Sequence, residues 1–351
     1  MIAIDDRLTS LCAGLACYED VTTFTGGQLS NDDLCRCQAT ALFVRSTTKV
    51  HSALLANTAV KFVATATSGT DHIDREWCAA NGITVVDAAG TNANAVAEWV
   101  MGVFAAVGVT TSNTVGVVGY GHVGQRIVRM CQTLGISTVV NDPPRLRAGL
   151  DVPNAVNLDT LLANSTVVTL HVPLTGTGED STVNLLTSRL LALLPKGALV
   201  INAARGGVLN EADAMKWIAK GGRVVADTFA GEPDIDVAYA RACALATPHV
   251  AGHTLNAFLD ASIVVGQAWC TWKGYPADSI YKACAVPTVP GSLQPDSRLH
   301  NVATTALERR GILADVAAMQ TLVIDAPSNH VGVRFSQMRK EYPLRPETFL
   351  L

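Results

Sequence analysis

"VGVVGYGHVGQRI", residues 115–127, decides the fold of this 351-residue chain. It begins with an apolar run typical of a buried strand and continues into a pattern typical of a helix. Between the two stand Gly119, Gly121 and Gly124, spaced as G-x-G-x-x-G. Glycines at these positions permit a tight turn and a close approach to the backbone. The stretch therefore predicts a strand, a tight turn and a helix in succession.

An acid follows at the distance that a dinucleotide site needs. "STVVND" (137–142) predicts the next strand, and Asp142 ends it about 20 residues after the glycines. In such folds the acid accepts the ribose hydroxyls and the pyrophosphate lies on the helix N-terminus. A carboxylate also repels a 2′-phosphate, so we expect NAD rather than NADP. The other interpretation is a glycine-rich turn that binds no ligand; the strand, helix and acid together favour NAD.

Strands and helices alternate for more than a hundred residues after this stretch, which predicts a doubly wound parallel sheet of the Rossmann type. Shorter apolar runs before it, at 39–46, 60–69 and 82–88, predict strands of a first α/β region. A long apolar helix is expected at 92–108 between the two regions. The first fold prediction is therefore an α/β chain with two sheets.

Composition excludes several classes of protein. The chain is 49% hydrophobic and 16% charged with a net charge of −4, which indicates a globular protein without a basic field for nucleic acid or membrane. The first 20 residues lack a signal peptide pattern, and no stretch reaches the length of a membrane span. The nine cysteines include no C-x-x-C pair, so we expect reduced thiols, no metal site and a cytoplasmic location.

"LVINAARGGVL" (199–209) is an unusual end for a buried strand, because a lone arginine, Arg205, stands at its mouth before two glycines. A solvated arginine in a turn is one interpretation, and an anion-binding arginine is the other. "VADTFAGEP" (225–233) and "ATPHVAGHT" (246–254) end two later strands with more charged residues. Carboxyl ends of parallel strands meet at one edge, where open α/β sheets bind ligands.

The charged residues at this edge suit hydride transfer from a 2-hydroxy acid. His249 can take the hydroxyl proton, because a histidine titrates near neutral pH. Glu232 beside it would orient and charge the ring. The fork of Arg205 suits a planar carboxylate. These three residue types match the required roles.

The motifs taken together resemble the D-2-hydroxyacid dehydrogenases. "GYGHVG", "HVPLT", "LLPKGALVINAARGGVLNEADAM", "ADTFAGEP" and "TPHVAGHT" match that family in order and spacing over residues 40–260. The resemblance implies a catalytic set of Arg205, Glu232 and His249. The chain is expected to contain a flavodoxin-like substrate domain at 1–91 and 255–284, a Rossmann NAD-binding domain at 92–254, and a small C-terminal α+β unit at 285–351. The branch of the family described next implies that this last unit is a dimerisation unit and that the protein is a homodimer.

Further motifs are similar to one branch of the family, the erythronate-4-phosphate dehydrogenases. They are "LFVRSTTKV", "KFVATATSGTDHID", "GTNANAVAEWV", "NDPPR" and the tail "FSQMRKEYPLR". This branch implies NAD-dependent oxidation of 4-phospho-D-erythronate to 2-oxo-3-hydroxy-4-phosphobutanoate in pyridoxal phosphate biosynthesis. Two alternatives remain: a phosphoglycerate or glyoxylate type of dehydrogenase, and an NAD-sensing binding module of the same fold.

The resemblance also implies individual contacts. Substrate contacts fall on Ser46, Thr67 and His253, the last at a position where the branch usually has tyrosine. Contacts with NAD fall on a set of residues after successive strands: Gly119, Gly121, His122, Val123, Gly124, Asp142, Val172, Ala203, Asp227 and Gly252.

A phosphorylated substrate needs cations besides Arg205. Arg45 and Lys49, near the end of a first-region strand, are one candidate pair. The basic tail is the other candidate, because in a dimer it could reach the neighbouring subunit's cleft; its cations are Arg339, Lys340 and Arg345.

Overall fold

The computed structural model describes residues 1–294, 297–325 and 330–349. The chain divides into two compact units. The first joins Met1–Asn92 with Thr254–Thr288, and the second joins Ala93–His253 with Val289–Leu351.

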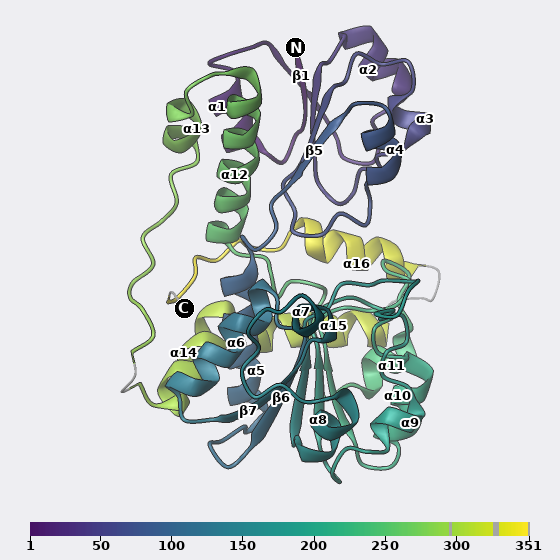
Figure 1. Cartoon of the computed structure of the whole chain (residues 1–351), viewed down its shortest axis with the longest axis vertical. Helices are drawn as coiled ribbons and strands as arrows, with labels where there is room; N and C mark the ends of the chain where they lie inside the picture. The colour runs from purple at the N-terminus through teal and green to yellow at the C-terminus, as the bar shows by residue number, and fades with distance from the viewer. Residues whose placement is uncertain (295–296, 326–329, 350–351) are drawn as a thin grey trace. The chain divides into compact units, whose positions relative to one another are not determined.

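The first unit contains a five-stranded parallel sheet of order β2-β1-β3-β4-β5, which is the flavodoxin-like order (Figure 1). The flavodoxin-like prediction is therefore confirmed. Its strands are β1 (Ile2–Asp5), β2 (Val21–Phe24), β3 (Ala41–Val44), β4 (Phe62–Thr65) and β5 (Thr84–Asp87). Its helices are α1 (Thr9–Leu15), α2 (Asn31–Cys37), α3 (Ser52–Leu55), α4 (Arg75–Ala80), α12 (Leu255–Lys273) and α13 (Asp278–Ala283).

Helices cover both faces of this sheet, so its central strands are buried on both sides and consist mainly of apolar residues. Every residue of β1, β3 and β4 is buried, as expected for central strands of a parallel sheet. Helix α12 returns late in the chain and packs against β4, β5, α1 and α13.

The second unit contains a six-stranded parallel sheet of order β11-β10-β9-β8-β6-β7. The chain leaves β6 for β7 on one side and then crosses to β8 on the other. The topological switch point therefore lies between β6 and β8, and the Rossmann prediction is confirmed. The strands are β6 (Thr114–Val118), β7 (Ser137–Asn141), β8 (Val167–Leu170), β9 (Leu199–Asn202), β10 (Arg223–Ala226) and β11 (Leu245–Ala246).

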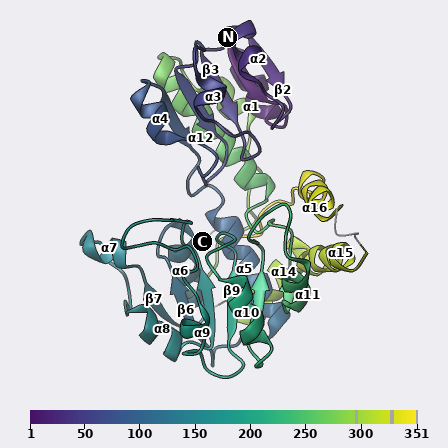
Figure 2. The ribbon, with the colours of Figure 1, turned by 90° about the vertical axis from the view of Figure 1, so that its right-hand side faces the viewer.

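Helices lie on both sides of this sheet (Figure 2). Neighbouring strand residues alternate between two core clusters: Val200 and Val224 belong to one, and Ile201 and Val225 belong to the other. This alternation follows from the pleat of the strands. The helices are α5 (Ala93–Val107), α6 (His122–Thr133), α7 (Pro143–Arg147), α8 (Leu158–Asn164), α9 (Ser188–Leu191), α10 (Glu211–Ile218) and α11 (Val237–Ala242).

The C-terminal segment of this unit is helical. It forms α14 (Leu299–Arg310), α15 (Ile312–Asp325) and α16 (Val331–Lys340), shown in yellow tones in Figure 1. The α+β prediction for this segment is wrong, because among its described residues there are helices and no strand. Gly311, with a φ of +65° in the left-handed region, ends α14 and separates it from α15.

The same segment packs into the core of the second unit. Helix α14 lies along α5, where Gly102 has no side chain and lets the backbone of Leu307 approach. Ala306 and Ile312 are fully buried in the core cluster that holds Phe104. No helix of the described part of the chain has the length and apolar character needed to cross a membrane.

Candidate active site

The expected site residues of the second unit lie at one edge of its sheet, because they follow the carboxyl ends of its parallel strands. The glycine loop follows β6, and Asp142 follows β7. Val172, Ala203 and Arg205 come after β8 and β9. Asp227 and Glu232 follow β10, and after β11 come His249, Gly252 and His253.

The glycine loop has the shape that a pyrophosphate needs. Gly119 has a φ of +93°, and a Cβ there would lie 2.5 Å from the carbonyl oxygen of His171. A Cβ at Gly124 would overlap the carbonyl oxygen of Gly119, so loop and helix are in close contact. Beside Gly121 there is open space instead, and no side chain caps the N-terminus of α6. The first residues of α6, exposed His122 and partly buried Val123, border this space. The loop therefore fits a dinucleotide phosphate.

Asp142 connects the glycine loop to the end of β7. Its Oδ2 accepts the N–H of Tyr120 at 2.7 Å, and its Oδ1 accepts the N–H of Arg145 at 3.0 Å, capping α7. The Arg145 guanidinium lies over the Tyr120 ring, 5.6 Å from its centroid. On the other side of the loop, the Val172 side chain comes within 2.9 Å of a Cβ position at Gly119. The acid is thus fixed beside the turn where the sequence predicted it.

Asn202, the last residue of β9, shapes the turn that presents Arg205. Its side-chain amide donates to the carbonyl oxygen of Arg205 at 3.0 Å and accepts the N–H of Ala204 at 3.2 Å. Gly206 follows, and a Cβ there would overlap the backbone of Phe229 in the loop after β10. The glycine behind the arginine therefore serves a direct backbone contact between two neighbouring loops.

Glu232 and His249 form a hydrogen-bonded pair. The Nδ1 of His249 lies 2.7 Å from Oε2 of Glu232, while Oε1 accepts the N–H of Phe229 at 2.8 Å. Because Nδ1 faces the carboxylate, it carries the proton and leaves Nε2 to exchange one. Burial alone would raise the pKa of Glu232, but its contacts with His249, Phe229 and Arg339 outweigh burial and hold that pKa below its usual value.

Asp227 holds the backbone of the His249 loop. Only 1% exposed, it accepts the Thr247 hydroxyl at 2.6 Å and the N–H groups of Val250 and Ala251 at 2.8 and 2.9 Å. Burial raises the pKa of Asp227, while the charge of His249 and these hydrogen bonds oppose the rise. His249 has a φ of +56°, which a residue with a Cβ adopts only when its surroundings impose it. Asp227 is thus a buried support for the loop.

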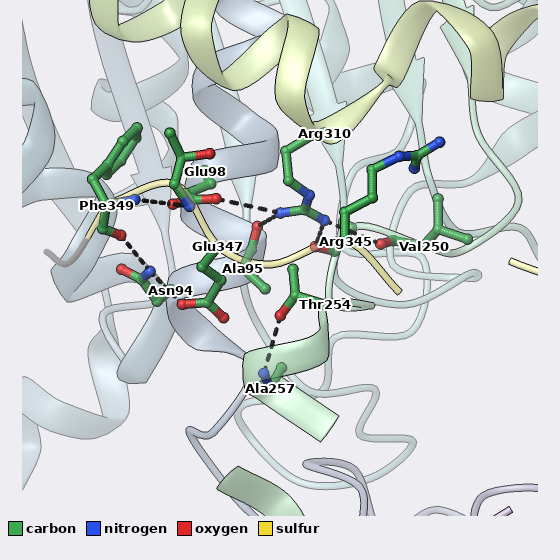
Figure 3. Close-up of polar contacts among 12 residues, drawn as sticks. Asn94, Ala95, Glu98, Val250, Thr254, Ala257, Arg310, Arg345, Glu347 and Phe349 are labelled. Atoms are coloured by element: carbon green, nitrogen blue, oxygen red, sulfur yellow. Dashed lines mark hydrogen bonds and ion pairs between the residues drawn. The ribbon is translucent and has the colours of Figure 1, made fainter. Parts of the chain in front are cut away.

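Arg310 of α14 holds the other side of the same loop, as Figure 3 shows. Its Nη2 donates to the carbonyl oxygens of Ala251 at 2.8 Å and Val250 at 3.4 Å, and its Nη1 donates to that of Ala95 at 2.5 Å. Arg310 is 1% exposed, and Glu98 lies 4.0 Å from Nη1. The C-terminal segment is therefore part of the support of the His249 loop.

Glu98 in turn fixes the end of the described chain. Its Oε1 accepts the N–H groups of Thr348 and Phe349, each at 2.7 Å. Asn94, one turn earlier on α5, donates to Glu347 at 2.6 Å and to the Phe349 carbonyl at 2.8 Å (Figure 3). Burial raises the pKa of Glu98 to about 7, although Arg310 and the two N–H groups counteract it.

Sequence reasoning missed these supporting residues. Arg310 stands beside exposed Arg309 in a helix, so nothing local marks it as buried.

The tail arginines, which the sequence offered as phosphate ligands, have carboxylate partners within their own chain. Arg339 lies 3.7 Å from Glu232, and Arg345 lies 3.6 Å from Asp315.

The first unit holds two of the expected substrate residues. Ser46 is exposed in the turn after β3. Thr67, after β4, shares a 2.7 Å hydrogen bond with the Thr65 hydroxyl and donates to the Gly69 carbonyl at 2.9 Å. Both follow carboxyl ends of the first sheet.

Two other histidines of the second unit differ from His249. Burial lowers the pKa of His171 to about 3, so its ring stays neutral, and its Nε2 lies 2.8 Å from the Thr169 hydroxyl. The rings of His253 and Tyr342 pack in a T-shaped arrangement, with 6.2 Å between centroids. His249 has in Glu232 the carboxylate partner that an acid–base catalyst needs.

Comparison with known proteins agrees with this geometry. Residues 94–251 match the family model of the D-isomer specific 2-hydroxyacid dehydrogenase NAD-binding domain. The chain is 34% identical to an erythronate-4-phosphate dehydrogenase of Proteus mirabilis, over 88% of this chain and 82% of that protein. It is 33% identical to one of Hahella chejuensis, over 98% of this chain and 91% of that protein.

A solved structure shares the fold. The D-lactate dehydrogenase of Aquifex aeolicus, complexed with NAD and lactic acid, superposes with a TM-score of 0.65 at 20% identity, covering 78% of this chain and 96% of that one. The sequence matches are more specific than this likeness and span most of the chain. The chain belongs to the erythronate-4-phosphate dehydrogenase family, and its second unit contains the NAD-binding domain of the D-isomer-specific 2-hydroxyacid dehydrogenases.

Proposed function

We propose that this protein oxidises 4-phospho-D-erythronate to 2-oxo-3-hydroxy-4-phosphobutanoate with NAD, a step of pyridoxal phosphate biosynthesis. The observation that carries the proposal is the 2.7 Å contact between Glu232 and His249 at the carboxyl edge of an NAD-binding sheet. Relatives that carry this activity in their names match nearly the whole chain. Both substrate and product are small phosphorylated acids.

His249 acts as the base of the oxidation. Its Nε2 takes the proton of the 2-hydroxyl group while the C2 hydrogen leaves as a hydride and the C2–O bond becomes a carbonyl. Glu232 holds Nδ1 and stabilises the imidazolium that forms. Bound NAD⁺ supplies the hydride acceptor. In the reverse direction the same imidazolium returns the proton.

Arg205 binds the substrate carboxylate, because its fork matches two carboxylate oxygens. Ser46, Thr67 and His253 are proposed to contact the rest of the substrate. Arg45 and Lys49 are proposed to bind the phosphate, because both stand after the carboxyl end of β3, beside Ser46.

The cofactor is proposed to lie along the edge from the glycine loop to the His249 loop. Asp142 would accept the adenosine ribose hydroxyls, and the open N-terminus of α6 would receive the pyrophosphate. The remaining proposed contacts are those expected from the sequence: Gly119, Gly121, His122, Val123, Gly124, Val172, Ala203, Asp227 and Gly252.

Assembly and location follow as further parts of the proposal. We propose a homodimer formed through the C-terminal segment and a cytoplasmic enzyme, with the first unit binding substrate and the second binding NAD. Three apolar side chains of this segment, Leu313, Ile324 and Val333, are more than half exposed, which supports a subunit contact there.

Assays with a panel of 2-hydroxy acids test the function. We expect NAD reduction with 4-phospho-D-erythronate well above that with 3-phosphoglycerate, glycolate and unphosphorylated erythronate. His249→Ala should abolish turnover, and His300→Ala, an exposed histidine on α14, should not change it. Turnover with 3-phosphoglycerate or glycolate instead would identify another branch. NAD binding without turnover of any acid would favour the binding module.

A further inference from the structure

Helix α16 rests on the loop that carries Glu232. Phe335 packs edge-on against Phe229, with centroids 6.1 Å apart and rings at 90°. A Cβ at Gly332 would overlap the carboxylate of Asp234, so the helix backbone comes directly onto the loop. Gly332 and Phe335 share one helical face, and that face continues one turn later at Arg339.

Arg339 reaches the same carboxylate oxygen that holds the catalytic histidine. Its Nη1 lies 3.7 Å from Oε2 of Glu232, and the Nδ1 of His249 lies 2.7 Å from that atom. The Arg339 side chain is 29% exposed. Its Nε is buried and has no hydrogen-bond partner within the part of the chain that the structure describes. Glu232 is therefore shared between an imidazole and a guanidinium.

We propose that Arg339 is a positioning residue of the acid–base pair, through which the C-terminal helix sets the pH range in which His249 can accept the substrate proton. This inference rests on the proposed function and assigns the basic tail a task within its own subunit. Arg339 acts through Glu232 and needs no contact with substrate.

The direction of the effect follows from the charges around the pair. Asp227 also acts on His249 and favours the imidazolium, and Glu211 interacts with the charge of Glu232. Arg339 acts in the opposite direction. While its charge is present, Glu232 is already paired with a cation when His249 is neutral. Protonation of His249 then places a second cation at the same carboxylate oxygen. Removing the positive charge of Arg339 should therefore stabilise the imidazolium, so that neutral His249 forms only at a higher pH. For charges at this separation near the surface we expect a shift of about half to one pH unit.

The test compares Arg339→Gln with a matched variant, Arg334→Gln, in the full-length protein. Arg334 is an exposed arginine of the same helix, so both changes remove one positive charge. The pH profile of kcat/KM for oxidation should move about half to one unit to higher pH in R339Q and stay in place in R334Q. Arg339→Lys, which keeps the charge, should restore most of the original midpoint.

A second readout separates this inference from the proposed function. Imidazole ¹⁵N spectra of the substrate-free protein can follow the titration of His249, assigned by the signal lost in His249→Gln. The same upward shift in R339Q and its reversal in R339K support the role whatever the substrate is. Should R339Q fail to fold, Arg339→Met, which also removes the charge but keeps an unbranched apolar side chain, takes its place in both readouts. An unmoved midpoint, or equal shifts in R339Q and R334Q, would overturn the proposal.

Discussion

Asp227 and Arg310 both bind the backbone of the same two residues, Val250 and Ala251. Asp227 accepts the N–H groups of Val250 and Ala251, and Arg310 donates to the carbonyl oxygens of these residues. One support comes from β10 and the other from α14, far later in the chain. The loop that presents His249 is therefore fixed by charge-assisted hydrogen bonds to every polar backbone group of these two residues.

Replacing Arg310 should be costly. Arg310→Met leaves Glu98 buried without a cation and removes the donors to three carbonyl oxygens. Loss of one partner of a buried pair destabilises a protein by about 3–5 kcal/mol. Urea unfolding should show a loss of this size, whereas Arg309→Met, at the exposed neighbouring position, should stay within about 0.5 kcal/mol of wild type. Similar stabilities for the two variants would contradict the role given to Arg310.

Glu98 should make stability depend on pH. Its pKa of about 7 in the folded protein lies above the usual glutamate value, so between about pH 4.5 and 7 the folded state binds more protons than the unfolded chain. Stability from this group therefore falls as the pH rises through that window, by about 3 kcal/mol in total. Glu98→Gln cannot ionise and should gain on wild type over the same window.

The measurement for Glu98 is the free energy of unfolding of wild type and E98Q at several pH values from 5 to 8. A difference that grows with pH is expected. The exposed Glu308→Gln on α14 serves as the control and should run parallel to wild type. A constant difference between E98Q and wild type would show that Glu98 does not titrate in this range.

Neutralising Glu232 should move the midpoint of the pH–rate profile in the opposite direction from removing the charge of Arg339. Glu232→Gln removes the anion that stabilises the imidazolium, so the midpoint of the pH–rate profile should fall by about 1–2 units. NAD affinity, measured by fluorescence titration, should stay within about twofold because a change that small is under half a kcal/mol. An unchanged profile in E232Q would rule out the pairing.

Asp142 should determine the choice of cofactor. Wild-type protein should bind NAD more tightly than NADP, and Asp142→Asn should reduce the preference by about tenfold, equal to about 1.4 kcal/mol of lost repulsion. Asparagine keeps an acceptor for one of the two backbone N–H groups that Asp142 holds, so stability should be measured alongside. Equal affinities of the wild-type protein for both cofactors would contradict the assignment.

The exposed face of α15 should form the dimer contact. Leu313 and Ile324 are 56% and 68% exposed and lie about three helical turns apart on one face. The double variant L313D/I324D should sediment as a folded monomer, because charges cannot be buried unpaired in an apolar interface. Val264→Asp, at an exposed apolar site of α12, should leave the assembly unchanged. A dimeric double variant would place the contact elsewhere.

The local sequence pattern was enough to predict the strands, the glycine turn and the edge of the sheet at which the site residues lie. Apolar runs marked the central strands, and the glycine turn marked the switch point between β6 and β8. Arg205, Glu232 and His249 could be grouped because strand ends of a parallel sheet share an edge. The 2.7 Å contact between Glu232 and His249 and the positive φ of His249 could be found only in the tertiary structure.

Contacts between distant parts of the chain could not be predicted from the sequence. Arg309 and Arg310 are identical neighbours, and only the packing of α14 along α5 decides which is buried. Gly311 stands inside a helical pattern, where an isolated glycine is often tolerated, yet here it ends the helix. The sequence pattern also did not show that Ala306 and Ile312 of the C-terminal segment belong to the core of the second unit.

Gly206 has a consequence for how the specificity of such an enzyme can change. Its bare Cα lies against the backbone of Phe229, so the arginine turn and the glutamate turn touch without any side chain between them. Even a single methyl group at position 206 would push the two turns apart. The separation between the turn that carries Arg205 and the turn that carries Glu232 is thus a fixed dimension of the main chain. Evolution toward longer or shorter acids must leave that dimension intact and act on the residues that meet the far end of the molecule.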